Sequence, residues 1–307
     1  MVALANRTWI KNIYRHWQLY LIVALPVLFL ITFNYVPLFG ALIAFKEYNP
    51  IQGIWRSPWV GMKQFDLFFN SPFFWPILRN TLMLSVYALC VGMPAAIVLA
   101  LCLNEVKNQR FKKVVQMVTY APYFISTVVL VGMINIILSP STGLYGQISK
   151  LFGTTPSLDL FGDPKIFSSL YVWSGIWQET GYSAVIFLAA LSGVNPELHE
   201  AAKMDGASRL QKIWNIDLPT IRPTIIVLLI LSVGGLLSIG FEKVYLLQNI
   251  MNLSHSEIIS TYVYKIGLIN TNYSFGVAVG LFNSVVGFIL IVTTNLLSRK
   301  FSDSSLF

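Results

Sequence analysis

The chain has 307 residues, of which 55% are hydrophobic and only 11% are charged. A soluble domain typically has about 25% charged residues, so this composition excludes an ordinary soluble protein and indicates a membrane protein. The net charge of +8 does not indicate nucleic-acid binding, because the basic residues are scattered and form no dense stripe.

Six apolar stretches of about twenty residues follow one another, which is the length that crosses a hydrocarbon core of roughly 30 Å. They are residues 19–44, 81–103, 114–138, 169–191, 224–239 and 274–297. The first is longer than the apolar core of a signal peptide, so we expect an uncleaved span. The sequence therefore predicts an all-α, polytopic membrane protein with six transmembrane helices. Residues 1–18 are expected to be a cytoplasmic N-terminal segment and residues 19–307 a transmembrane domain.

The basic residues indicate the orientation of these spans. More than half of the lysines and arginines lie before span one, after span two, between spans four and five, and after span six. Arg7, Lys11 and Arg15 precede the first span. Because positively charged loops stay in the cytoplasm, we expect both termini and the segment between spans four and five to be cytoplasmic.

Residues 45–78, between the first two spans, are rich in aromatic side chains and prolines. Trp and Phe can bury a ring while the backbone stays near water, which is typical of a membrane interface. We expect this aromatic segment to lie on the outer face, either as a simple interfacial belt or with a role in substrate passage.

Residues 195–223 are the most polar stretch of comparable length and lie between two apolar runs. Asn195 can cap a helix that starts at Pro196, and Gly206 can end it in a left-handed conformation. We expect a second short helix over about 207–216, with Leu210 and Trp214 on one face. Pro219 and Pro223 are then expected to break that helix, and the next begins in a new direction.

The same stretch resembles the signature loop of ABC importer permeases of the carbohydrate (maltose-type) family. The matching positions fall at fixed spacings without gaps: Glu200, Ala201, Ala202, Asp205, Gly206, Ile216, Leu218 and Pro219. The resemblance implies that 195–223 contains a coupling helix that docks on a separate ATPase subunit. The stretch around residues 37–65 is similar, more loosely, to permeases for oligosaccharides from polysaccharide breakdown. The alternative role of residues 195–223 is that of a helix–turn–helix connector between two spans.

This resemblance also implies the partners. They are a second, homologous permease that forms a heterodimer with this chain, two ATPase subunits that bind ATP and Mg, an extracytoplasmic solute-binding protein and an oligosaccharide substrate. The chain would then lie in a bacterial cell membrane. The sequence contains no G-x-x-x-x-G-K-[ST], so ATP would be bound elsewhere. We find no catalytic constellation, no metal-ligand spacing and no cofactor motif, and we expect no enzymatic activity in this chain alone.

Glu179 lies near the middle of span four, and an ionisable group at membrane depth is a functional candidate. The resemblance places Trp177, Tyr182 and Ser232 in the substrate cavity, and Gln178 has suitable chemistry. An uncharged residue is expected where Glu179 stands, so we expect Glu179 to contribute to substrate selection. Packing between spans is the alternative role for each of these residues.

Two other functions stay open. An ion-coupled secondary transporter would have paired charges at mid-membrane and inverted repeats. Glu179 is a single mid-membrane charge and therefore supports this function only weakly. An ABC permease for a solute other than a sugar would have the same coupling segment.

Overall fold

The computed structural model describes residues 15–153 and 159–301. Arg7 and Lys11 of the expected cytoplasmic N-terminal segment lie outside the described residues. The chain divides into two compact units, of which the first comprises Met1–Phe69 with Ile266–Leu281, and the second Asn70–Lys265 with Phe282–Phe307. The described residues are almost entirely helical, and their β contact is one isolated bridge between Lys46 and Trp59.

The first unit begins with one long apolar helix in three conformations, α2 (Trp17–Leu30), η1 (Ile31–Tyr35) and η2 (Val36–Phe45). Two short helices follow, α3 (Gly53–Arg56) and α4 (Lys63–Phe69). Its small core is aromatic, because Phe45 stacks on Trp59 and Phe68 packs edge-on to Phe275. The expected outer aromatic segment therefore packs partly on itself.

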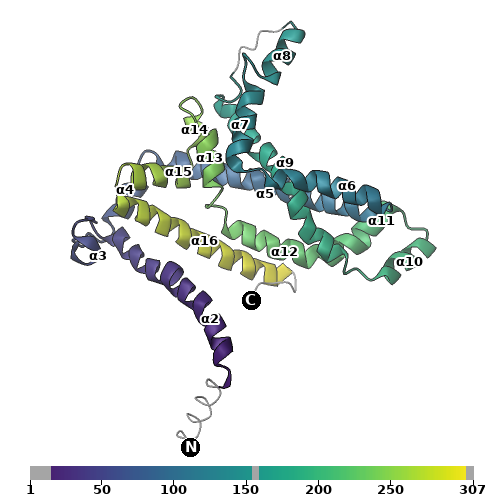
Figure 1. The fold of residues 1–307 in the computed structure, drawn as a ribbon, viewed down its shortest axis with the longest axis horizontal. Coiled ribbons are helices and arrows are strands. Elements are labelled where there is room, and N and C mark those ends of the chain that lie inside the picture. The colour runs from purple at the N-terminus through teal and green to yellow at the C-terminus, as the bar shows by residue number, and fades with distance from the viewer. Residues whose placement is uncertain (1–14, 154–158, 302–307) are drawn as a thin grey trace, which may run out of the picture. The chain divides into compact units, whose positions relative to one another are not determined.

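The second unit is a helical bundle whose longest members are α5 (Phe74–Glu105) and α9 (Pro164–Leu191), which share its largest helix–helix interface (Figure 1). The other helices are α6 (Gln109–Tyr120), η3 (Ala121–Phe124), α7 (Thr127–Leu138), α8 (Leu144–Leu151), α10 (Pro196–Met204), α11 (Arg209–Lys212), η4 (Ile213–Asp217), α12 (Leu218–Gly234), α13 (Phe241–Leu247), α14 (Leu253–Ser256) and α15 (Ile259–Val263). Helices η5 (Tyr264–Ile269) and α16 (Tyr273–Phe301) each contribute residues to both units.

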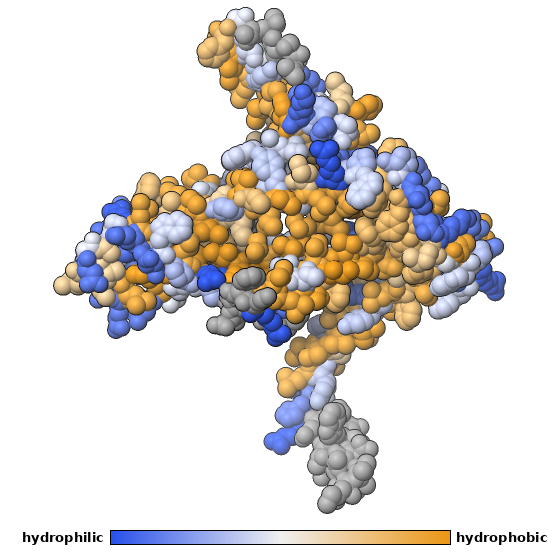
Figure 2. Space-filling model, turned by 180° about the vertical axis from the view of Figure 1, so that it is seen from behind, coloured by the Kyte–Doolittle hydropathy of each residue, from blue (hydrophilic) through white to orange (hydrophobic). Residues whose placement is uncertain are grey.

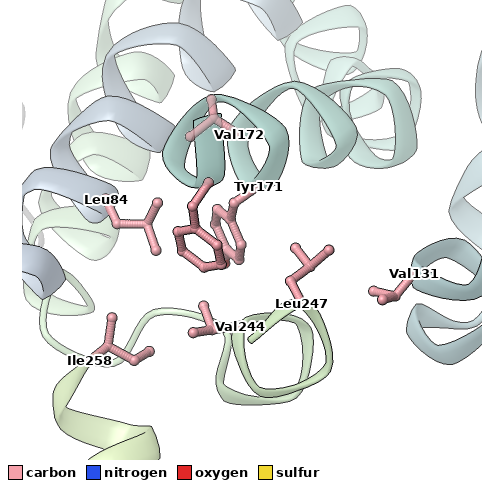
Figure 3. Close-up of a cluster of buried hydrophobic side chains, with 8 residues drawn as sticks. Leu84, Val131, Tyr171, Val172, Val244, Leu247 and Ile258 are labelled. Atoms are coloured by element: carbon pink, nitrogen blue, oxygen red, sulfur yellow. The ribbon is translucent and has the colours of Figure 1, made fainter. Parts of the chain in front are cut away.

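Two apolar clusters hold this bundle together. In one, Tyr171 of α9 and Val244 and Leu247 of α13 pack with Leu84 of α5 (Figure 3). In the other, Ala100 of α5, Phe187 of α9 and Ile221 at the start of α12 are buried together. Hydrophobic atoms cover the middle of the unit, and hydrophilic ones gather around α10 and α11 (Figure 2). This distribution is typical of a helix bundle whose middle faces lipid or another apolar surface.

Four helices of the described chain are long and apolar enough to cross a membrane: Trp17–Phe45, Phe74–Glu105, Arg209–Gly234 and Tyr273–Arg299. A fifth candidate is the pair Gln109–Phe124 and Thr127–Leu138, bent by 96°. The third span expected over 114–138 therefore corresponds to this bent pair of helices. The expected fourth span corresponds to α9, whose 28 residues include many polar and aromatic side chains.

The break expected at Pro219 and Pro223 is absent. Helix α11 continues through the π-helical turn η4 into α12, as one helix from Arg209 to Gly234. Pro219 lies in the first turn of α12 and Pro223 one turn later. Because the π turn locally changes the hydrogen-bond pattern next to Pro219, the missing N–H donor is tolerated without a change of direction.

Candidate functional site

The N-terminal part of segment 195–223 has the local structure that its sequence predicts. The side chain of Asn195 accepts a hydrogen bond from the backbone N–H of Glu197 at 3.0 Å, and α10 starts at Pro196. Gly206 has φ +73°, a left-handed conformation that glycine adopts without strain. Ser208 and Gln211 then form a capping box that starts α11. Both the cap and the glycine turn predicted from the sequence are confirmed.

The turn between α10 and α11 presents its signature residues to the outside of the chain. Glu200, Ala201, Asp205 and Gly206 are exposed, and Ala202 is half-buried. The C-terminal part of the signature lies deeper, because Ile216 and Leu218 pack against the second apolar cluster. Pro219 is exposed.

Large apolar side chains are exposed beside this turn. Met204 is 88% exposed, and Leu198, Leu210 and Trp214 are also exposed. Leu210 and Trp214 are four residues apart and so share a helix face, as the sequence predicts. Exposed apolar side chains gathered on a polar segment are typical of a protein interaction site.

Two contacts between ionisable side chains join the short helices α10 and α11 to longer helices. Nε2 of His199 in α10 lies 3.1 Å from Oδ1 of the fully buried Asp217 in η4. Nε of Arg209 in α11 lies 4.0 Å from Oε2 of Glu105, at the end of α5.

A cavity of about 490 Å³ lies within the second unit, between α5, α9, α12 and α13. That volume is in the range of small-molecule sites. Polar side chains on its wall come from all four elements: Ser85, Tyr171, Glu179, Thr180, Ser183, Ser232 and Lys243. Most other lining residues are apolar, so the cavity combines an apolar wall with a few polar groups.

The cavity brings together two of the five predicted substrate residues, Glu179 of α9 and Ser232 of α12. Trp177 and Tyr182 are about half-exposed and do not line it, and Gln178 is buried. The ring of Tyr182 stacks on that of Tyr123, with centroids 4.0 Å apart. Nε2 of Gln178 donates to the Ile125 carbonyl at 2.8 Å. Gln178 and Tyr182 therefore contact the bend between α6 and α7.

The helical periodicity of α9 explains why some of the predicted residues line the cavity and others contact the bend between α6 and α7. Gly175, Glu179 and Ser183 are spaced by four residues, share one face of α9, and all line the cavity. Gln178, Gly181 and Tyr182 lie on another face, where a side chain at Gly181 would collide with the Thr119 carbonyl. The small and polar i, i+4, i+8 pattern of α9 is a sequence signal that identifies the cavity face.

Lys243 is the residue that sequence reasoning missed. It lies beyond the predicted fifth span, and yet it is only 8% exposed and lines the cavity. Helix α13 packs its neighbours Val244 and Leu247 against α9, which carries Lys243 inward (Figure 3). No local pattern in the sequence predicts this contact between distant elements.

Comparison with known proteins identifies the family. Residues 92–303 match the family described as binding-protein-dependent transport system inner membrane component. Protein LplB of Bacillus subtilis (strain 168) is 43% identical over 98% of this chain and 94% of its own length. The polygalacturonan/rhamnogalacturonan transport system permease protein YteP of the same organism is 42% identical over the same shares.

A solved structure is similar over almost the whole chain. It is the crystal structure of a bacterial ABC transporter involved in the import of the acidic polysaccharide alginate, with TM-score 0.88 and 37% identity, covering 96% of this chain and 99% of that one. The same transporter type in complex with an alginate pentasaccharide-bound periplasmic protein matches with TM-score 0.88 and 36% identity. The chain belongs to the family of inner membrane components of binding-protein-dependent transport systems.

Proposed function

We propose that this chain is one of two permease subunits of an ATP-driven importer of oligosaccharides. It forms half of the translocation pathway with six spans and cytoplasmic termini, and a second, homologous permease forms the other half. Two ATPase subunits bind ATP and Mg, and an extracytoplasmic binding protein delivers the substrate. The observation that carries the proposal is the capped α10–Gly206–α11 turn, with exposed apolar residues beside its signature.

The turn suits docking on a groove of an ATPase. A short helix that presents an apolar face is a common way to occupy a groove. Trp214 and Leu210 supply large apolar contacts, and Glu200 and Asp205 supply charges at the rim. On closure, the ATPases push on the turn, and the contacts His199–Asp217 and Arg209–Glu105 pass the displacement to α12 and α5.

Two observations support an oligosaccharide as the substrate. The cavity combines hydroxyls of Ser85, Thr180 and Ser232 with the carboxylate of Glu179, and these groups can hydrogen-bond sugar hydroxyls. The relatives include a permease for polygalacturonan and rhamnogalacturonan and a transporter for alginate. Tilting of the bundle would open this cavity alternately to the two sides.

Purification of the tagged chain from its own host in mild detergent tests the proposal. We expect an ATPase subunit and a second permease to co-purify, and the complex to hydrolyse ATP faster with binding protein and substrate. Uptake driven by an ion gradient, without ATP and without a bound ATPase, would contradict the proposal and favour a secondary transporter.

A further inference from the structure

The ammonium group of Lys243 is buried on the wall of the cavity. Nζ donates a hydrogen bond to the Tyr171 carbonyl at 3.0 Å and lies 4.9 Å from the centroid of the Tyr171 ring. An ammonium has three donors, and one carbonyl occupies one of them. These contacts fix the position of the group and leave donor capacity toward the cavity.

Lys243 has no carboxylate partner at ion-pair distance in the described parts of the chain. Ion pairs there join Lys63 to Glu47, His199 to Asp217, Arg209 to Glu105 and Lys265 to Glu257. Removing a cation from water is costly, and a nearby anion offsets part of that cost. The carboxylate of Glu179 attracts the Lys243 ammonium from beyond ion-pair distance. The ammonium can therefore still donate a hydrogen bond to an anion that enters the cavity.

Lys265 of the same unit is a useful contrast. Its Nζ is 2.7 Å from Glu257 Oε2 and 2.6 Å from Gln248 Oε1, so its charge is satisfied within the protein. It is also partly buried, and it does not line the cavity. Lys265 therefore has a structural role that Lys243 lacks.

The backbone of α9 leaves room beside the ammonium. A Cβ atom at Gly175 would lie 3.1 Å from Lys243 Nζ, which is close enough to displace it. Glu179 follows one turn later on the same face and is exposed, so water screens its charge. The charge of Lys243 is buried and is therefore screened less by water than that of Glu179.

We infer that Lys243 binds the carboxylate of a uronate residue as an acidic oligosaccharide passes through the cavity, while Glu179 accepts hydrogen bonds from its hydroxyls. This inference rests on the proposed function and adds a specificity-determining residue to it. A charge-assisted hydrogen bond from a fixed ammonium to a carboxylate is stronger than one between neutral groups. The same site would lose most of its attraction for a sugar whose carboxylate is esterified.

The test uses the intact complex in proteoliposomes with saturating binding protein. The probes are galacturonate and alginate oligosaccharides and their methyl esters. For each probe, uptake by a variant is divided by uptake by the wild type. Any preference of the binding protein for one probe is then the same in both measurements and cancels in the ratio. We expect Lys243→Met to lower uptake of an acidic probe by roughly tenfold or more and to leave uptake of its ester unchanged. Lys243→Arg should retain most of the uptake.

Two further variants separate recognition from folding. Gly175→Ala keeps the charge but displaces the ammonium, and should lower uptake of the acidic probe selectively. Lys265→Met breaks an internal ion pair and should affect acidic and esterified probes equally. The inference is overturned if Lys243→Met lowers uptake of the acidic and the esterified probe equally, or lowers uptake of neither. It is also overturned if a wild-type complex with a working ATPase imports no acidic probe. Absence of an ATPase from the wild-type complex would instead refute the proposed function.

Discussion

His199 Nε2 lies 3.1 Å from Asp217 Oδ1, and this contact joins the helix before the Gly206 turn to the π turn that leads into α12. Asp217 is fully buried. A buried carboxylate whose partner is removed keeps the cost of its desolvation, so the pair holds α10 against the bundle. The contact therefore joins α10 to the long helix that continues through α12.

Replacement of His199 by Ala should weaken the transfer of force from the turn. We expect a loss on the order of 2 kcal/mol in stability, with ATP hydrolysis continuing while substrate uptake per ATP falls. The measurement is the ratio of uptake to hydrolysis in proteoliposomes, together with the melting temperature. His199→Gln, which keeps a donor, is the control. A normal ratio in His199→Ala would show that the contact has no part in coupling.

Gly206 provides a second test. Its φ of +73° is accessible to Gly and to Asn but not to Pro, whose φ is fixed near −65°. Gly206→Pro should leave the protein in the membrane and abolish transport, and Gly206→Asn should retain most of it. Membrane insertion is followed by fractionation, and transport by uptake. Substrate-stimulated hydrolysis by an intact Gly206→Pro complex would argue against a role for the turn.

The apolar face beside the turn can be tested by affinity. Trp214→Ala should weaken binding of the ATPase by about 2 kcal/mol, or roughly 30-fold, because large aromatic side chains contribute most to such interfaces. Leu151→Ala in α8, where the side chain is 85% exposed and far from the turn in sequence, is the matched control and should have no effect. Equal ATPase retention by both variants after detergent washing would exclude Trp214 from the interface.

Glu179 lines the cavity, so its substitution should change substrate selection. Glu179→Gln keeps the shape of the side chain and removes its charge, and we expect altered apparent affinity for at least one transported oligosaccharide. Uptake kinetics over a panel of neutral and acidic sugars measure this. Unchanged affinity and rate for every sugar would remove Glu179 from the site.

Gln178 should act on the bend between α6 and α7 rather than on the substrate. Gln178→Leu removes the hydrogen bond to the Ile125 carbonyl, which costs about 1–3 kcal/mol when a buried acceptor loses its donor. We expect lower thermal stability and equal loss of uptake for all sugars. A change in preference between sugars would instead place Gln178 in the substrate pathway.

Much of the coupling segment is predictable from sequence because its determinants are local. Asn195 caps the helix that it precedes, and Gly206 adopts a left-handed conformation that most other residues adopt only with strain. The all-helical fold also follows from composition and apolar length. These features depend on residues within a few positions of one another.

Other features depend on contacts between distant parts of the chain. The bend at residues 125–126 is held by Gln178 and Tyr182, more than fifty residues away, so Pro122 alone does not reveal it. Lys243 enters the cavity because α13 packs on α9. The continuous helix through Pro219 depends on a π turn that no sequence pattern signals.

Site-directed labelling of the α10–α11 turn tests the central claim most directly. After replacement of the free, exposed Cys90 and Cys102, a cysteine at position 204, where Met204 is 88% exposed, is treated with a membrane-impermeant maleimide. The account predicts labelling only from the cytoplasmic side, in inside-out vesicles, and protection when the ATPase is bound. Labelling from outside intact cells, or equal labelling with and without the ATPase, would contradict it.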